Sequence, residues 1–220
     1  MVQQMNVDYI LRVNDLDIFY TNETNGGGDH FFIEYTEVVS KWYGKVNNLL
    51  EWCSGPGFIG YGMLGTGICN SVSFNEIFAP AIDMCRKTAT ENNLDVNIYA
   101  EENLDNVEEQ FDLVVGNPPH WSTVDDAKES MQNLGSLINI EDRTKQILVD
   151  EDWKAHRSFF KNMKRLLKKD GRILLQENST GSNPKMFSEL LKDTGLKILG
   201  HVDSVAYNSI NIYYLEIGHE

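Results

Sequence analysis

The stretch that most constrains the fold is a short apolar run that ends in two prolines, within residues 111–121. Residues 111–115 are mostly apolar and rich in β-branched side chains, which is typical of an inner strand. Pro118 and Pro119 cannot donate to a sheet ladder, and each keeps the residue before it out of the helical region. The strand must therefore stop and run into a rigid tip that presents the Asn117 amide and two backbone carbonyls. Ligands bind at the carboxyl ends of strands in open α/β sheets, so this tip is a candidate site.

Strand and helix patterns alternate along the chain, which predicts a three-layer α/β sandwich with a mostly parallel sheet. Strands are expected at residues 18–20, 46–52, 71–74, 96–100, 111–115 and 172–176. Helices are expected at residues 31–43, 79–92, 152–167 and 184–194, and a glycine-rich turn at 55 runs into a helix that reaches 64. The last two strand candidates, 197–202 and 210–217, have no helix between them, so they should form an antiparallel hairpin.

Two further boundaries follow from the pattern. The helix at 152–167 should close in a basic last turn, Lys168-Lys169, followed by Gly171. Residues 121–151 are polar and show no clear periodicity, which is typical of a functional loop or lid. We therefore expect an N-terminal extension with a helix at 1–44, a possible cover on the substrate side, and a main domain at 45–220 with a lid-like insertion at 121–151.

Composition narrows the class of protein. The net charge is −14 over 220 residues, which argues weakly against a long nucleic acid as partner, because phosphate binding needs concentrated Lys and Arg. One basic cluster spans residues 161–169, but its spacing suits the solvated face of a helix. Three cysteines with no CxxC pair argue against a disulfide framework. Together with the lack of a signal-peptide pattern and of an apolar run of membrane length, they favour a reducing cytoplasm. The scattered histidines indicate no metal site.

A second candidate site lies upstream, where Gly55 and Gly57 follow the strand at 46–52. Glycines there let the backbone approach a ligand, and the helix that follows offers free N–H groups. A lone G-x-G pattern is structural about as often as it is functional, but its position between a strand and a helix favours binding. Glu76 ends the next strand, where an acid can hold both hydroxyls of a ribose. Glu102, or its neighbour Glu101, ends the third strand and could accept from an adenine amino group.

The order of these motifs resembles class I S-adenosylmethionine-dependent methyltransferases. Glu51-x-Cys53-x-Gly55-x-Gly57 matches the family's glycine loop, with Cys53 where the first glycine usually stands. Asn117-Pro118-Pro119 matches the N/D/S-P-P-aromatic signature of the branch that methylates planar nitrogens, and His120 replaces the usual aromatic residue. The resemblance extends from about residue 45 to the end and is closest to release-factor glutamine and ribosomal RNA guanine-N2 methyltransferases.

The resemblance implies a Rossmann-like, seven-stranded sheet, an S-adenosyl-L-methionine cofactor and a role for each matching residue. Asn117 and Pro118 would accept the two N–H bonds of the substrate nitrogen, and His120 would complete the catalytic tip. Pro119, His120 or Trp121 would contact the planar substrate group. The expected cofactor contacts are Glu51 near the methionine moiety, then Cys53, Gly55, Gly57, Glu76, Ile77, Glu102 and Asn117.

Three functions remain open at this point. The leading expectation is methylation of a protein glutamine amide, because the acidic surface favours a protein over a nucleic acid as substrate. The second is methylation of an exocyclic amine on an RNA or DNA base. The third is a non-catalytic scaffold that binds the cofactor, since Cys53 and His120 depart from the family pattern.

Overall fold

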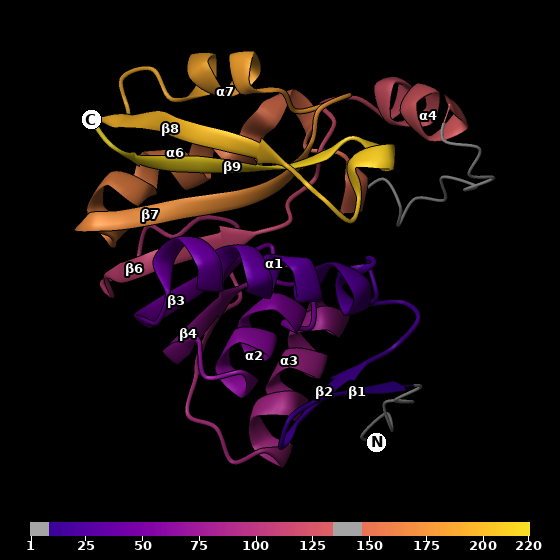
Figure 1. The fold of residues 1–220 in the computed structure, drawn as a ribbon, viewed down its shortest axis with the longest axis vertical. Helices are drawn as coiled ribbons and strands as arrows, with labels where there is room; N and C mark the ends of the chain where they lie inside the picture. The colour runs from indigo at the N-terminus through magenta and orange to yellow at the C-terminus, as the bar shows by residue number, and fades with distance from the viewer. Residues whose placement is uncertain (1–8, 134–146) are drawn as a thin grey trace. The chain divides into compact units, whose positions relative to one another are not determined.

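The computed structural model describes residues 9–133 and 147–220, which divide into two compact units, one ending at Glu102 and the other beginning at Asn103 (Figure 1). This division differs from the expected boundary between residues 44 and 45, which stays a prediction. No described helix has both the length and the apolar character needed to cross a membrane.

The first unit contains a small antiparallel hairpin and three strands of the main sheet. Its elements are β1 (Tyr9–Val13), β2 (Leu16–Tyr20), α1 (Gly28–Tyr43), β3 (Val46–Trp52), α2 (Phe58–Gly65), β4 (Cys69–Asn75), α3 (Ala79–Glu91) and β5 (Asn97–Tyr99). The strands β5, β4 and β3 pair in parallel in that order. The hairpin β1–β2 is held to α3 by hydrogen bonds from the backbone N–H of Phe19 to Thr88 and from that of Asp17 to Asn92.

The second unit contains the other four strands in the order β6-β7-β9-β8. Its elements are β6 (Phe111–Gly116), α4 (Val124–Asn133), the 3₁₀ turn η1 (Glu151–Trp153), α6 (Lys154–Leu166), β7 (Leu167–Asn178), α7 (Pro184–Leu190), β8 (Leu196–Asp203), η2 (Asn208–Ile210) and β9 (Ile212–His219). The strands β6 and β7 are parallel, whereas β9 is antiparallel to both β7 and β8. The expected α/β fold is therefore confirmed, with a mostly parallel seven-stranded sheet and a C-terminal antiparallel hairpin.

Each unit has its own apolar core, which positions the ends of its strands. In the first, the rings of Tyr61 on α2 and Phe74 on β4 lie 4.4 Å apart and are fully buried. In the second, Phe160 of α6 and Phe187 of α7 meet edge to face at 6.1 Å and are also fully buried. The first pair joins a helix to the sheet and the second joins two helices, and buried aromatic pairs of this kind stabilise such packing.

The helix expected at 152–167, with a basic last turn at Lys168-Lys169, differs at its end. It stops at Leu166 and the two lysines lie in β7, because the buried side chain of Leu167 already joins that strand opposite Phe111. Residues 168–171 then form an irregularity in the strand register, where Lys168 pairs with Asp112 at 2.9 Å.

The segment 121–151 is not without helical structure, since α4 occupies part of it. Thr123 caps this helix: its hydroxyl accepts from the backbone N–H of Asp126 at 3.1 Å and donates to the Asp126 carboxylate at 2.6 Å. The first bond is an N-cap contact that satisfies one of the free N–H groups at the start of the helix. The central part of the expected lid, residues 134–146, lies outside the described residues, and the lid stays a prediction.

Candidate functional site

The glycine loop between β3 and α2 is built from three residues with positive φ. Cys53, Gly55 and Gly57 have φ angles of 53°, 54° and 91°. A side chain at Gly57 would collide with Tyr61 and Phe74 at 2.6–2.9 Å, whereas one at Gly55 would meet only the Thr24 carbonyl oxygen at 3.9 Å. Gly57 is therefore needed for packing, while the backbone at Gly55 lies open to close approach.

Glu51 sits near the end of β3 with only 2% of its surface exposed. Its two carboxylate oxygens accept from the backbone N–H groups of Gly60 at 2.7 Å and Ile59 at 3.3 Å, at the start of α2. Burial raises the pKa of Glu51 to about 8, and these two hydrogen bonds offset only part of that effect. Glu51 is thus a buried acid that a nearby cation would ionise.

Glu76 ties the end of β4 to the glycine loop. One carboxylate oxygen accepts from the Gly55 N–H at 2.7 Å, and the other accepts from Ile77 at 2.8 Å and Phe78 at 2.9 Å. The structure therefore brings Gly55 and Glu76 together, with the Ile77 side chain 66% exposed beside them. Their roles toward a ribose and a cofactor stay predictions.

The end of β5 is held by Asn75 rather than by an acid. The buried amide of Asn75 donates to the carbonyl oxygens of Tyr99 and Glu101, both at 2.9 Å. Glu102 follows and is exposed. The expected contact of Glu102 with an adenine amino group stays a prediction.

In the second unit, β6 delivers the Asn-Pro-Pro tip as expected. The strand ends at Gly116, Asn117 and Pro119 are half-buried and Pro118 is buried. The Oδ1 atom of Asn117 is buried, and among the described residues no donor lies within hydrogen-bond distance of it. A buried acceptor left without a donor destabilises a protein by about 1–3 kcal/mol, so the unpaired Oδ1 of Asn117 calls for a functional explanation.

His120 and Trp121 are both fixed by the segment that returns at residues 148–150. Their backbone N–H groups both donate to the Leu148 carbonyl at 3.1 Å, and Asp150 donates back to the Trp121 carbonyl at 2.8 Å. Trp121 is 2% exposed, and its indole N–H donates to Ser130 at 3.2 Å. The His120 side chain retains 11% exposure. Which ring contacts a substrate stays a prediction, but His120 has the more accessible side chain here.

Behind the tip lies a buried cluster of titratable side chains that the sequence analysis missed. His120 Nδ1 lies 3.1 Å from Glu177 Oε2, His156 Nε2 lies 3.6 Å from Glu177 Oε1, and His156 Nδ1 lies 2.7 Å from Asp150 Oδ2. The 3.6 Å contact is an ion pair too long for a hydrogen bond. We call these four residues the acid–histidine chain. No motif signals it, because its members are far apart in sequence and come from separate elements.

The electrostatics of the acid–histidine chain favour its ionised form. Burial lowers the pKa of His156, but the Asp150 hydrogen bond and the Glu177 charge outweigh burial and raise it. Burial raises the pKa of Glu177 and of Asp150, yet their histidine partners outweigh it and lower both. The geometry therefore favours a positive His156 between two negative carboxylates.

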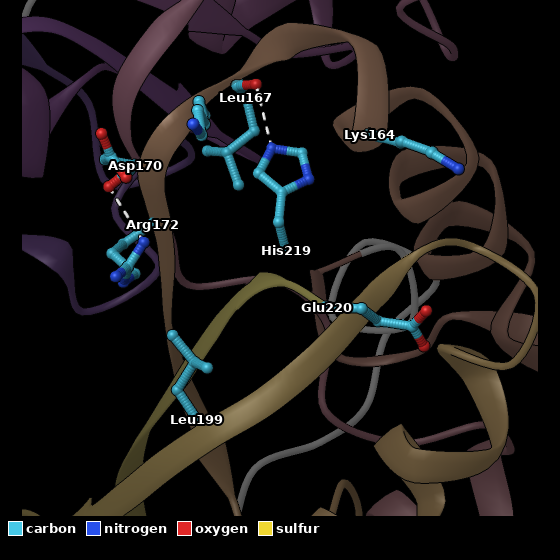
Figure 2. A pocket seen from close by; sticks show the side chains of 8 residues that line it. Lys164, Leu167, Asp170, Arg172, Leu199, His219 and Glu220 are labelled. Atoms are coloured by element: carbon cyan, nitrogen blue, oxygen red, sulfur yellow. Dashed lines mark hydrogen bonds between the residues drawn. The ribbon is translucent and has the colours of Figure 1, made fainter.

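The basic cluster at 161–169 is largely committed to the structure of the second unit. Arg165 donates to the backbone carbonyls of Val107 and Leu104, and Lys168 pairs with Asp112. A cavity of about 550 Å³ lies beside the cluster, and Figure 2 shows the side chains that line it. Lys164, Lys169 and Arg172 share its lining with Asp170 and Glu220, so its charge is mixed.

Comparison with known proteins decides the family. The model of the methyltransferase small domain matches residues 28–138, about half of the chain. The chain belongs to the methyltransferase small domain family. This confirms the expected methyltransferase class, and the match includes both the glycine loop and the Asn-Pro-Pro tip.

The relatives found by sequence carry one description. The chain is 30% identical over 128 residues to ribosomal RNA small subunit methyltransferase C of Actinobacillus pleuropneumoniae serotype 5b (strain L20), covering 56% of this chain and 38% of that protein. It is 33% identical over 98 residues to the protein of the same description from Haemophilus influenzae (strain PittEE), covering 44% and 28%. The matched region spans 38% of the first relative's length and 28% of the second's.

Solved structures confirm the fold at low sequence identity. The 16S rRNA N2 methyltransferase of T. thermophilus, solved in complex with AdoMet and guanosine, matches 96% of this chain and 50% of its own, with a TM-score of 0.58 and 14% identity. The ribosomal protein L11 methylase of Lactobacillus delbrueckii subsp. bulgaricus matches 89% and 80%, with a TM-score of 0.58 and 13% identity. Because proteins named for RNA and protein acceptors fit equally well, fold alone does not select the substrate.

The expectation of a protein rather than a nucleic acid as substrate was wrong. The relatives matched by sequence are all described as ribosomal RNA methyltransferases. The expectation rested on net charge, which describes the whole surface and says little about one local binding site.

Proposed function

We propose that this chain is an S-adenosyl-L-methionine-dependent N-methyltransferase that acts on an exocyclic amine of a base in ribosomal RNA. The observation that carries the proposal is the buried, unpaired Oδ1 of Asn117 at the rigid end of β6. An exocyclic amine has the N–H group that such an acceptor lacks. The ribosomal RNA relatives support RNA as the acceptor class.

The tip residues would act on the amine by orientation and electrostatics. Asn117 Oδ1 and the Pro118 carbonyl oxygen would each accept one N–H bond, which turns the nitrogen lone pair toward the methyl group. Positive charge develops on that nitrogen during transfer, and two fixed acceptor dipoles stabilise it without reorganising. The two prolines keep the acceptors in place because they leave the backbone few other conformations.

The residues of the first unit fit the cofactor. Glu51 is buried, and burial raises its pKa to about 8, so the positive charge of the methionine ammonium would favour its ionised form. Gly55 offers an open stretch of backbone beside Glu76. When bound, S-adenosyl-L-methionine supplies an activated methyl group on a sulfonium. Glu51, Gly55 and Glu76 would hold it, with Cys53, Gly57, Ile77 and Glu102 as further contacts.

The test is to identify the acceptor with labelled cofactor. The protein is incubated with methyl-labelled S-adenosyl-L-methionine and, separately, deproteinised ribosomal RNA and ribosomal protein. Label should enter RNA, and digestion to nucleosides should find the methyl group on an exocyclic nitrogen. The Asn117→Ala variant serves as the matched control and should transfer no label.

Three results would contradict the proposal. Label in protein would restore the glutamine interpretation, and label on a ring nitrogen or ribose would exclude the amine. Calorimetric binding of S-adenosyl-L-methionine without transfer to either acceptor would indicate a non-catalytic scaffold.

A further inference from the structure

The acid–histidine chain lies behind the tip, and only its first member, His120, belongs to the tip itself. We propose that Glu177 is a positioning residue that holds His120 in the tautomer with its proton on Nδ1, leaving Nε2 as a hydrogen-bond acceptor at the tip. The inference rests on the proposed function only in assuming that His120 contacts the acceptor base.

Glu177 can only accept from His120. Its Oε2 already accepts from the Ser182 hydroxyl at 2.5 Å, and it lies 3.1 Å from His120 Nδ1. Burial raises the pKa of Glu177, but the hydrogen bond with His120 and the ion pair with His156 outweigh burial and lower it, which favours the ionised carboxylate, and an ionised carboxylate has no proton to donate. The hydrogen bond to His120 therefore requires a proton on Nδ1.

The tautomer determines what the tip offers to a substrate. In a neutral imidazole that donates from Nδ1, the remaining nitrogen carries a lone pair. Nε2 of His120 then joins Asn117 Oδ1 and the Pro118 carbonyl, and all three are acceptors. A base that brings N–H donors is favoured at such a tip, and one that brings only acceptors is disfavoured.

Glu177 also fixes the orientation of the ring. The His120 backbone is held by its N–H donation to Leu148, and the ring is held by Glu177, so neither end is free to rotate. A clamp that is already ordered loses less entropy when the substrate binds. Loss of the Glu177 acceptor should therefore lower turnover with little effect on cofactor binding.

Besides His120, Glu177 contacts His156 and Ser182, and each of these is held in turn by another side chain. His156 comes from α6, and Asp150 precedes η1 and accepts from His156 Nδ1 at 2.7 Å. Tyr213 of β9 donates to the Ser182 carbonyl at 2.6 Å, and burial together with the Glu177 charge raises its pKa, so it stays neutral. Asp150 therefore acts on Glu177 only through His156 and touches neither nitrogen of His120.

The first measurement needs no activity. The ring nitrogens of the five histidines are observed by ¹⁵N nuclear magnetic resonance over a pH series that reaches the neutral form of each ring, and the His120 signals are assigned as those lost in His120→Asn. We expect a protonated Nδ1 and an unprotonated Nε2. A proton on Nε2 in the unmodified protein would overturn the proposal.

Three variants separate positioning from general stability. Glu177→Met removes the acceptor at similar volume and should shift the His120 proton toward Nε2. It should also lower kcat for RNA methylation about tenfold, with the cofactor Kd within about twofold. Glu177→Gln keeps a carbonyl acceptor and should restore both the tautomer and most of kcat. Asp150→Asn is the matched control, because it damages the same chain but should leave the His120 tautomer unchanged.

The outcomes distinguish this inference from the proposed function. If Glu177→Met folds and leaves the His120 tautomer or kcat unchanged, Glu177 is not a positioning residue. If it does not fold, the tautomer of the unmodified protein and of Glu177→Gln still decides the question. If the tautomer is as expected but no RNA base is methylated, the positioning of His120 stands and the proposed function fails.

Discussion

The two units hold the polar groups at their strand ends in different ways. In the first, the carboxylates of Glu51 and Glu76 accept from backbone N–H groups, two for Glu51 and three for Glu76. In the second, Asn117 Oδ1 has no donor among the described residues, and the chain behind the tip links side chain to side chain, with backbone N–H donors only at its far end, on Asp150. Backbone donors keep their place as long as the helix exists, whereas a side-chain network depends on charge. The first unit, with the glycine loop, should therefore tolerate side-chain changes that the second unit, with the Asn-Pro-Pro tip, does not.

The largest effect is expected at the tip, from Asn117→Ala. Removing one preorganised acceptor of this kind lowers the transfer rate by roughly 10²–10³-fold. The same change deletes a buried oxygen that has no partner, so the free energy of unfolding should hold or rise by up to about 1 kcal/mol. Single-turnover transfer from labelled cofactor and urea unfolding measure the two effects.

The measured stability of Asn117→Ala decides whether the two units differ in this way. A large loss of stability would mean that the amide is structural, like the acids of the first unit. The Asn75→Ala variant is a useful reference, since that amide donates to two carbonyl oxygens and its loss should destabilise the fold.

The next effect is the pH-dependent stability supplied by Asp150. Its pKa is lowered because its hydrogen bonds with His156 and Ala155 outweigh burial, so its stabilisation is present above its usual pKa of about 3.9 and lost as the pH falls through the folded value. The pKa of His156 is raised, so its stabilisation is present below about 6.5 and lost as the pH rises through the folded value. Asp150→Asn should cost about 2–3 kcal/mol near neutral pH and less toward either extreme.

Urea unfolding of Asp150→Asn across the pH range tests this window. Asp152→Asn is the matched control, because Asp152 is exposed, two residues away, and its positive φ of 56° suits asparagine. A constant difference between the protein and Asp150→Asn at all pH values would show that the pair with His156 is not ionised.

What could be predicted from the sequence depended on whether a feature arises from neighbouring residues or from residues brought together by folding. The strand β3 was expected at 46–52 and occupies those residues, because apolar periodicity is local and strong. The Asn-Pro-Pro tip was predictable because proline acts on its own neighbours. The acid–histidine chain was not, because Asp150, His156 and Glu177 meet only after α6 packs on β7, and no spacing rule links them. Leu167 joined β7 for a related reason, since burial outweighed the helix-closing signal that follows it.

A smaller effect is expected from Glu51, through the linkage of cofactor binding to pH. Burial raises its pKa to about 8, so below that pH it must lose a proton before it can pair with the methionine ammonium. Affinity for S-adenosyl-L-methionine should therefore rise by up to about tenfold per pH unit as the pH approaches 8, and then level off. Calorimetry in buffers of different ionisation enthalpy should detect proton release, which Glu51→Gln should abolish. Affinity that is independent of pH would place the ammonium elsewhere.

The smallest effect is expected in the glycine loop. It tests whether the backbone, rather than side chains, determines the conformation of this loop in the first unit. Cys53 adopts a φ of 53°, a conformation that costs a residue with a side chain about 1–2 kcal/mol, whereas Gly55 at 54° pays no such cost. Cys53→Gly should raise the free energy of unfolding by about 0.5–1 kcal/mol, after the greater flexibility of glycine in the unfolded chain offsets part of the gain. Gly55→Ala should lower it by about 1 kcal/mol through backbone strain, since the nearest atom to the added methyl group is 3.9 Å away. Thermal unfolding of the two variants should thus shift in opposite directions. A loss of stability in Cys53→Gly would mean that contacts of the thiol outweigh the backbone strain. The glycine loop of the first unit would then also depend on a side chain.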